Sequence, residues 1–195
     1  MNTSNNSKMS TRTLTLLALL TALVAILSYM GGFVKIGSLA SISLTLIPVV
    51  LGAALCGPWS GAWLGGVAGV VFFITPDAAF WFGLSIPGTI ITVMIKGIAS
   101  GLFAGYVFKL FEARSRYFAT MLSAIVCPVI NTGIFILGCL VFFMDTVKAG
   151  AVAEGISVWW YLLVFFVGLN FVFELITNVV FSPIILRLLN IRNKK

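Results

Sequence analysis

Long apolar runs alternate with short polar segments along this chain. The runs are Leu14–Met30, Leu44–Cys56, Trp59–Ile74, Pro87–Phe111, Tyr117–Met144 and Val158–Leu188. A helix crosses a bilayer with about 20 apolar residues, whereas strands of membrane barrels are alternating segments of about 10. The pattern therefore predicts an all-α membrane protein, a compact bundle of six transmembrane helices, although the second and third runs are short for full spans.

The same pattern divides the chain into three parts. Residues 1–12 are predicted to be a disordered tail, residues 13–189 the membrane domain, and residues 190–195 a basic tail. The first apolar run follows Lys8 and Arg12, as the apolar part of a signal peptide would. It is long for such a segment and no A-x-A cleavage pattern follows, so we interpret it as a retained helix.

The amino-acid composition also indicates a membrane protein and argues against an enzyme. Hydrophobic residues make up 61% and charged residues 9% of the 195, whereas a soluble domain has roughly a quarter charged residues. The sequence has no G-x-x-x-x-G-K-[ST] phosphate loop, so the chain alone is not expected to hydrolyse ATP. With no histidine, five carboxylates and three scattered cysteines, it shows no set of catalytic or metal-ligating residues. We therefore predict no enzymatic activity, no metal and no cofactor.

The net charge of +7 has a topological explanation rather than one in nucleic-acid binding. Most basic residues fall on the N-terminal tail, the fourth connection and the C-terminus, which share one side of a six-helix chain. They are Lys8, Arg12, Lys109, Arg114, Arg116, Arg187, Arg192, Lys194 and Lys195. The positive-inside rule then predicts that both termini are cytoplasmic.

Two charged residues, Lys96 and Glu174, lie deep inside apolar runs. Charge in hydrocarbon is expensive, so both are functional candidates. At 1.5 Å per residue, Lys96 lies about 13 Å from the outer end of its helix and Glu174 about 24 Å. Two interpretations remain open: the charges neutralise each other as a buried pair, or one of them meets a polar ligand.

Amide side chains accompany these charges. Asn170, Glu174 and Asn178 recur every four residues and form one stripe, which must face the bundle or a cavity. Asn131 lies about 21 Å along the fifth helix, at a depth similar to that of Lys96 and Asn170. An outward-facing polar pocket would accommodate all three. The predicted substrate-binding residues are Lys35, Phe80, Trp81, Thr92, Lys96, Asn131 and Asn170. Glu174 and Asn178 are predicted to position the sixth helix.

Two outer connections are predicted to close this pocket. Residues 31–43 are long, glycine-containing and moderately apolar, and they include Lys35. Residues 75–83 carry three adjacent aromatics, Phe80, Trp81 and Phe82. Their length and composition are more typical of lids than of plain turns.

Small residues recur at helical spacing in three helices, which allows close approach of membrane helices. Ala18 and Ala22, with Ala25 close to the same face, mark the first helix. This face either packs inside the bundle or docks another protein. The glycine ridges of the third and fourth helices are predicted to pack internally. They consist of Gly61, Gly65 and Gly69 and of Gly97, Gly101 and Gly105.

Taken in order, these motifs resemble those of the substrate-binding S components of energy-coupling factor (ECF) vitamin transporters, small bacterial membrane proteins with six helices. The resemblance covers roughly Thr13 to Leu189. It rests on Ala18-x-x-x-Ala22, Ile42–Pro48, Gly57–Ala62 and the segment Asn170-Phe171-x-x-Glu174-Leu175-x-x-Asn178.

The resemblance implies a high-affinity vitamin-binding subunit in the bacterial plasma membrane, with a pocket that opens outward beneath the first and third outer loops. It also implies partners, namely a transmembrane coupling protein and two ATPases that power transport. In this family the A-x-x-x-A face of the first helix meets the coupling protein, which places that contact on Ala18 and Ala22.

The substrate is left open at this stage. Lys96 with amide groups suits a carboxylate, and Lys35 in the lid could add to it. This favours pantothenate, with folate next and riboflavin or another vitamin if Lys96 is paired with Glu174. A different class also remains open, a stand-alone ion-coupled carrier with Glu174 as the proton site.

Overall fold

The computed structural model describes residues 10–31, 35–36, 40–41 and 44–193. Helices dominate this part of the chain, and two very short strands connect the first two helices. The elements are α1 (Thr11–Gly31), β1 (Lys35–Ile36), β2 (Ala40–Ser41), α2 (Leu46–Cys56), α3 (Pro58–Phe72), α4 (Pro76–Leu84), α5 (Ile86–Phe111), α6 (Arg116–Phe142), α7 (Met144–Ala153), α8 (Val158–Tyr161), the π-helix η1 (Leu162–Gly168) and α9 (Leu169–Asn193).

Among the residues described, four helical segments are long and apolar enough to cross a bilayer: α1, α5, α6 and residues Asn170–Asn190 of α9. Two bent pairs of helices pass the same test together, α3 with α4 (83°) and α7 with Val158–Val164 (101°). The predicted second span is only the short apolar helix α2. The chain is thus a multi-pass helical membrane protein with four to six candidate spans.

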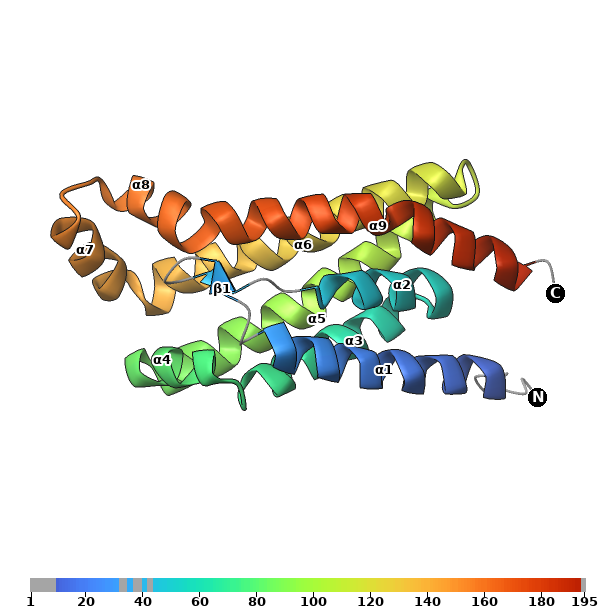
Figure 1. Cartoon of the computed structure of the whole chain (residues 1–195), viewed down its shortest axis with the longest axis horizontal. Coiled ribbons are helices and arrows are strands. Elements are labelled where there is room, and N and C mark those ends of the chain that lie inside the picture. The colour runs from blue at the N-terminus through green and yellow to red at the C-terminus, as the bar shows by residue number, and fades with distance from the viewer. Residues whose placement is uncertain (1–9, 32–34, 37–39, 42–43, 194–195) are drawn as a thin grey trace, which may run out of the picture.

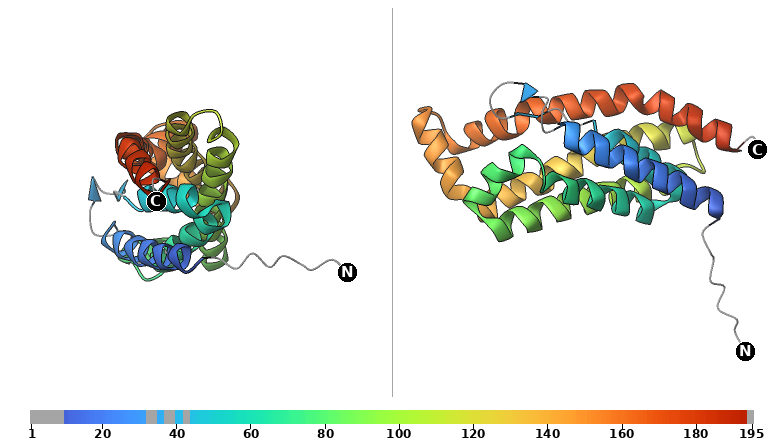
Figure 2. Two further views of the ribbon diagram at one scale, coloured as in Figure 1. Left: turned by 90° about the vertical axis from the view of Figure 1, so that its right-hand side faces the viewer. Right: turned by 60° about the horizontal axis from the view of Figure 1, so that its bottom comes forward.

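The bundle is elongated, and its helices run along the long axis (Figure 1). The start of α1, the end of α9 and the turn between α5 and α6 lie at one end, and α4, α7 and α8 lie at the other. The end-on view shows α1 at the edge of the bundle (Figure 2). The clusters of basic residues on these segments, at Arg12, Arg114–Arg116 and Arg187, are therefore on the same end of the molecule.

The connection at residues 75–83, which we predicted to act as a lid, folds largely as helix α4. Pro76 occupies the first turn of that helix, where its missing N–H and fixed φ are favourable, and the extended backbone of Thr75 precedes it. The predicted sixth span is likewise interrupted, by α8 and η1 before α9. Of the other predicted lid, Gly31 ends α1 and Lys35–Ile36 pairs antiparallel with Ala40–Ser41, and the remaining residues lie outside the described part of the chain.

The two glycine ridges pack against each other and join α3 to α5. A Cβ atom added at Gly61 would collide with the carbonyl of Gly101, and one at Gly65 with the carbonyl of Gly97. The helices run antiparallel, so these two glycine pairs follow each other in reverse order, whereas Gly69 contacts Val93 of α5 and Gly105 contacts Pro58 of α3. The prediction of internal packing for these ridges is confirmed, and the contact fixes how α5 is rotated.

We expect Gly65→Ala to lower the thermal unfolding temperature in detergent by roughly 2–10 °C, from an overpacking cost of about 1–3 kcal/mol. The matched control is Gly66→Ala, because a Cβ there would lie 3.4 Å from Ile98 Cγ1, an ordinary contact. A fluorescence melt of both variants measures the difference. Equal melting temperatures would contradict the close contact between the ridges.

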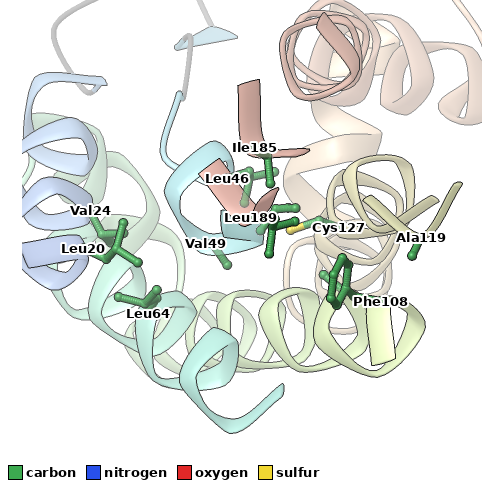
Figure 3. Packing of buried hydrophobic residues seen from close by; sticks show 12 residues of the cluster. Leu20, Val24, Leu46, Val49, Leu64, Phe108, Ala119, Cys127, Ile185 and Leu189 are labelled. Atoms are coloured by element: carbon green, nitrogen blue, oxygen red, sulfur yellow. The ribbon is translucent and has the colours of Figure 1, made fainter. Parts of the chain in front are cut away.

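The main hydrophobic cluster occupies the half of the bundle near the ends of the chain. Leu20 and Val24 of α1 lie beside Leu64 of α3, and Ile185 and Leu189 of α9 close the other side (Figure 3). A second cluster, around Cys139, Phe143, Val147 and Leu162, occupies the far half. Polar residues of α5, α6 and α9 lie between the two clusters along their helices, and they form the site described next.

Candidate functional site

A cavity of about 120 Å³ lies between the two hydrophobic clusters. One water molecule needs roughly 10–15 Å³ of such space, so the cavity is large for a packing defect. Helices α1 to α6 and α9 all contribute to its wall. The polar lining residues are Ser28, Thr45, Thr75, Asp77, Lys96, Asn131, Asn170 and Glu174. The cavity therefore combines a cation, two carboxylates, amides and hydroxyls in a single space.

Lys96 provides the positive charge of the wall. Its Nζ lies 5.0 Å from the ring centroid of Phe135 and 5.9 Å from that of Phe72, within the range of cation–π attraction. Its neighbour Gly97 belongs to the glycine ridge and also lines the cavity. The close contact of that ridge with α3 thus sets the direction in which α5 presents Lys96.

Glu174 provides buried negative charge, with only 5% of its surface exposed. Asn170 Nδ2 donates to its Oε1 at 3.4 Å, and Asn178 Nδ2 donates to its backbone carbonyl at 2.8 Å. Its Oε2 has no hydrogen-bond partner within the described part of the chain. Neither carboxylate oxygen therefore accepts from Lys96, so the buried pair, one of the two interpretations that the sequence left open, is not formed as a hydrogen-bonded salt bridge among these residues.

The rim of the cavity contains residues that the sequence analysis missed. Ser28 Oγ donates to Thr45 Oγ1 at 3.2 Å and links α1 to the start of α2. Thr75 Oγ1 donates to the carbonyl of Phe72, at the bend between α3 and α4. Asp77 follows in the first turn of α4. Two features of the sequence could have identified these residues: Asp77 lies inside a predicted lid, and Thr45 lies inside a motif on which the resemblance rests.

The structure brings Lys96, Asn131 and Asn170 together in the cavity wall. Glu174, which we expected mainly to position the last helix, lines the same cavity, whereas Asn178 is fully buried outside this lining. The Lys35 side chain lies outside what the structure describes. Three of the seven predicted binding residues thus share one space, and Glu174 joins them.

Thr92 does not line the cavity. Its side chain fills the space over Gly138, where an added Cβ would collide with it, so it packs α5 against α6. Trp81 lies in the second hydrophobic cluster, with ring centroids 5.4 Å from Phe135 and 5.2 Å from Phe143. Trp81 therefore packs against Phe135, the ring beside Lys96, and does not itself line the cavity.

Phe80 is 49% exposed on α4 and also lies outside the cavity lining. On α1, Ala18 and Ala22 are exposed and Ala25 is half-buried. The opposite face of that helix buries Leu20 and Val24 against the core. The small-residue face is therefore not used for packing inside the described bundle.

A multi-pass helical bundle with a polar cavity between two apolar clusters defines a membrane protein built to hold a small solute. The chain belongs to the family described as ECF transporter, substrate-specific component, whose sequence model matches residues 12–189. Searches of curated proteins and of solved structures found no match. Members of this family are transporter subunits rather than enzymes, and they work with a vitamin substrate and membrane-embedded ECF components.

Proposed function

We propose that this chain is the high-affinity vitamin-binding subunit of an ECF transporter in a bacterial plasma membrane, and that pantothenate is its substrate. The observation that carries the proposal is the convergence of Lys96, Asn131 and Asn170 on one cavity. An ammonium group and amide N–H groups are donors suited to a carboxylate. A neutral vitamin would leave the charge of Lys96 without a counter-charge from the ligand.

Pantothenate also suits the rest of the wall. It has one carboxylate, an amide and two hydroxyl groups, and the wall adds acceptors and hydroxyls around Lys96. Folate and riboflavin differ from it in the number of carboxylates and in size. In this proposal helix α4, formed by one of the two predicted lids, covers the pocket, since Asp77 of α4 lines the cavity.

Transport in this proposal is powered by partners. A transmembrane coupling protein and two ATPases supply the ATP hydrolysis, for which the chain has no phosphate loop. Both termini are cytoplasmic, because the basic clusters lie at the end of the bundle that contains them. The coupling protein docks on the exposed Ala18 and Ala22 of α1, where small side chains permit close helix contact.

We expect the purified chain to bind pantothenate with sub-micromolar affinity and without ATP, because the cavity is complete within this one chain. Calorimetry against pantothenate, folate, riboflavin, biotin and thiamine measures this directly. Absence of any sub-micromolar ligand would contradict the proposal. Proton-driven uptake into proteoliposomes that contain this chain alone would instead support a stand-alone carrier with Glu174 as its proton site.

A further inference from the structure

Two acceptor atoms in the cavity wall have no hydrogen-bond partner in the part of the chain that the structure describes. They are Asn170 Oδ1 and Glu174 Oε2, on successive turns of α9. Two other buried atoms, Thr92 Oγ1 and Asn178 Oδ1, share this property but belong to residues outside the cavity lining. Only the Asn170 and Glu174 atoms therefore belong to residues that line the cavity.

These acceptors matter energetically once a ligand fills the cavity. A buried polar group left without a partner costs about 1–3 kcal/mol, and more if it is charged. A ligand that binds against these atoms loses affinity unless it provides the hydrogen bonds that they lack. Lys96 does not supply them, since neither oxygen of Glu174 accepts from it. No other described residue donates to these two atoms either, so we assign the donor to the ligand.

We propose that the substrate carries both an anionic group, held by Lys96 and Asn131, and a hydrogen-bond donor, a hydroxyl or amide N–H, held by Asn170 Oδ1 and Glu174 Oε2. The inference rests on the proposed function, because it concerns the same cavity, and it narrows the substrate to carboxylates that also donate. It also gives Glu174 a direct part in binding. Carboxylates without a donor, and donors without a carboxylate, are excluded.

A panel of water-soluble compounds tests this selectivity by calorimetry on the full chain. Pantothenate offers a carboxylate with hydroxyl donors, and biotin a carboxylate with ureido N–H donors. Lipoate and nicotinate have a carboxylate without such a donor at neutral pH, and riboflavin has donors without a carboxylate. We expect the tightest ligand to come from the first pair, at least about tenfold tighter than any other compound, which matches one lost hydrogen bond to a charged group.

The outcomes separate the inference from the proposed function. If lipoate, nicotinate or riboflavin binds as tightly as the best of the first pair, the bifunctional ligand is wrong while a vitamin-binding function stands. If no compound binds, the proposed function fails and the inference fails with it. A further compound, 5-aminovalerate, carries a carboxylate and an ammonium group instead of a neutral donor. If it binds more tightly than either member of the first pair, the assignment of a hydroxyl or amide donor is wrong.

A substitution of Glu174 tests whether this residue accepts a hydrogen bond from the ligand. We expect Glu174→Gln to weaken binding of pantothenate by about 10–100-fold, because the amide presents N–H groups where the carboxylate only accepts. The matched control is Glu112→Gln, the same change at an exposed residue beyond the end of α5, with no expected effect.

The bis-O-methyl ether of pantothenate completes the cycle, because it keeps the carboxylate and the amide N–H and loses both hydroxyl donors. If a hydroxyl is the donor, the ether binds the wild-type chain weakly and loses little further affinity in the Glu174→Gln variant; if the amide N–H is the donor, the ether binds the wild type fully and loses affinity in the variant as pantothenate does. Full wild-type affinity for the ether would overturn a hydroxyl donor, and this arm does not depend on folding of the variant. An unchanged affinity of the variant for pantothenate would overturn the role of Glu174.

Discussion

Replacing Lys96 by methionine is expected to weaken vitamin binding by about 100-fold or more while the protein stays folded. Methionine has a similar length and suits the contacts with Phe72 and Phe135, but it removes the only positive charge among the cavity-lining residues that the structure describes. Truncating one partner of a buried hydrogen-bonded charge pair typically costs about 2–5 kcal/mol, and each 1.4 kcal/mol is tenfold. Calorimetry with pantothenate measures the loss.

The matched control for this variant is Lys109→Met, the same substitution in the last turn of the same helix. That lysine is exposed and far along α5 from the cavity, so the affinity should stay within about twofold of the wild type. A melt of both variants shows whether either change disturbs folding. If Lys96→Met melts normally and still binds pantothenate at full affinity, the anion site is elsewhere.

Depth along a helix was the part of the site that the sequence could predict. A constant rise per residue placed Lys96, Asn131 and Asn170 at similar levels, and the structure brings them to one cavity. Glu174 was counted as deeper because the count assumed an uninterrupted α-helix from Val158. Residues Leu162–Gly168 are π-helical instead, so that count does not measure depth along one axis.

Rotation about the helix axis was the part that the sequence could not predict. Thr92 and Lys96 are one turn apart and share a face by period, yet Thr92 packs on Gly138 of α6 while Lys96 reaches the cavity. The reason is that α5 lies between α3 and α6, so two residues one turn apart on the same face of α5 have different neighbours. The contact of Gly65 with Gly97 decides which residues turn inward, and spacing alone did not identify these glycines as partners.

Two predicted aromatic residues, Phe80 and Trp81, lie outside the cavity lining for a related reason. A run of Phe80, Trp81 and Phe82 between two apolar helices has the composition of a lid and equally of a short packed helix. Pro76, one residue after Thr75, was the signal for the helix, since proline favours the first turn. Trp81 then packs on Phe135 and Phe143, and it affects Lys96 only through the Phe135 ring.

Replacing Ala22 by tryptophan is expected to abolish uptake in cells that supply the coupling protein and the ATPases, while purified protein binds vitamin within about threefold of the wild type. Ala22 is exposed, and the buried side of α1 is formed by Leu20 and Val24, so the added ring does not enter the core. Close helix contact through small residues tolerates no such bulk, because dispersion contacts are lost when backbones separate. Ala18→Trp should behave in the same way.

The control is Ala149→Trp, the same substitution at an exposed alanine of α7, at the opposite end of the bundle from the start of α1. Uptake should persist in that variant. Vitamin uptake by cells and calorimetry on purified protein separate the two interpretations of the small-residue face. Loss of uptake with binding retained identifies a docking surface, whereas loss of both in the α1 variants would show that the face packs within this chain. Because α1 also carries Ser28, which hydrogen-bonds Thr45 in the cavity lining, one helix connects the proposed docking surface to the cavity.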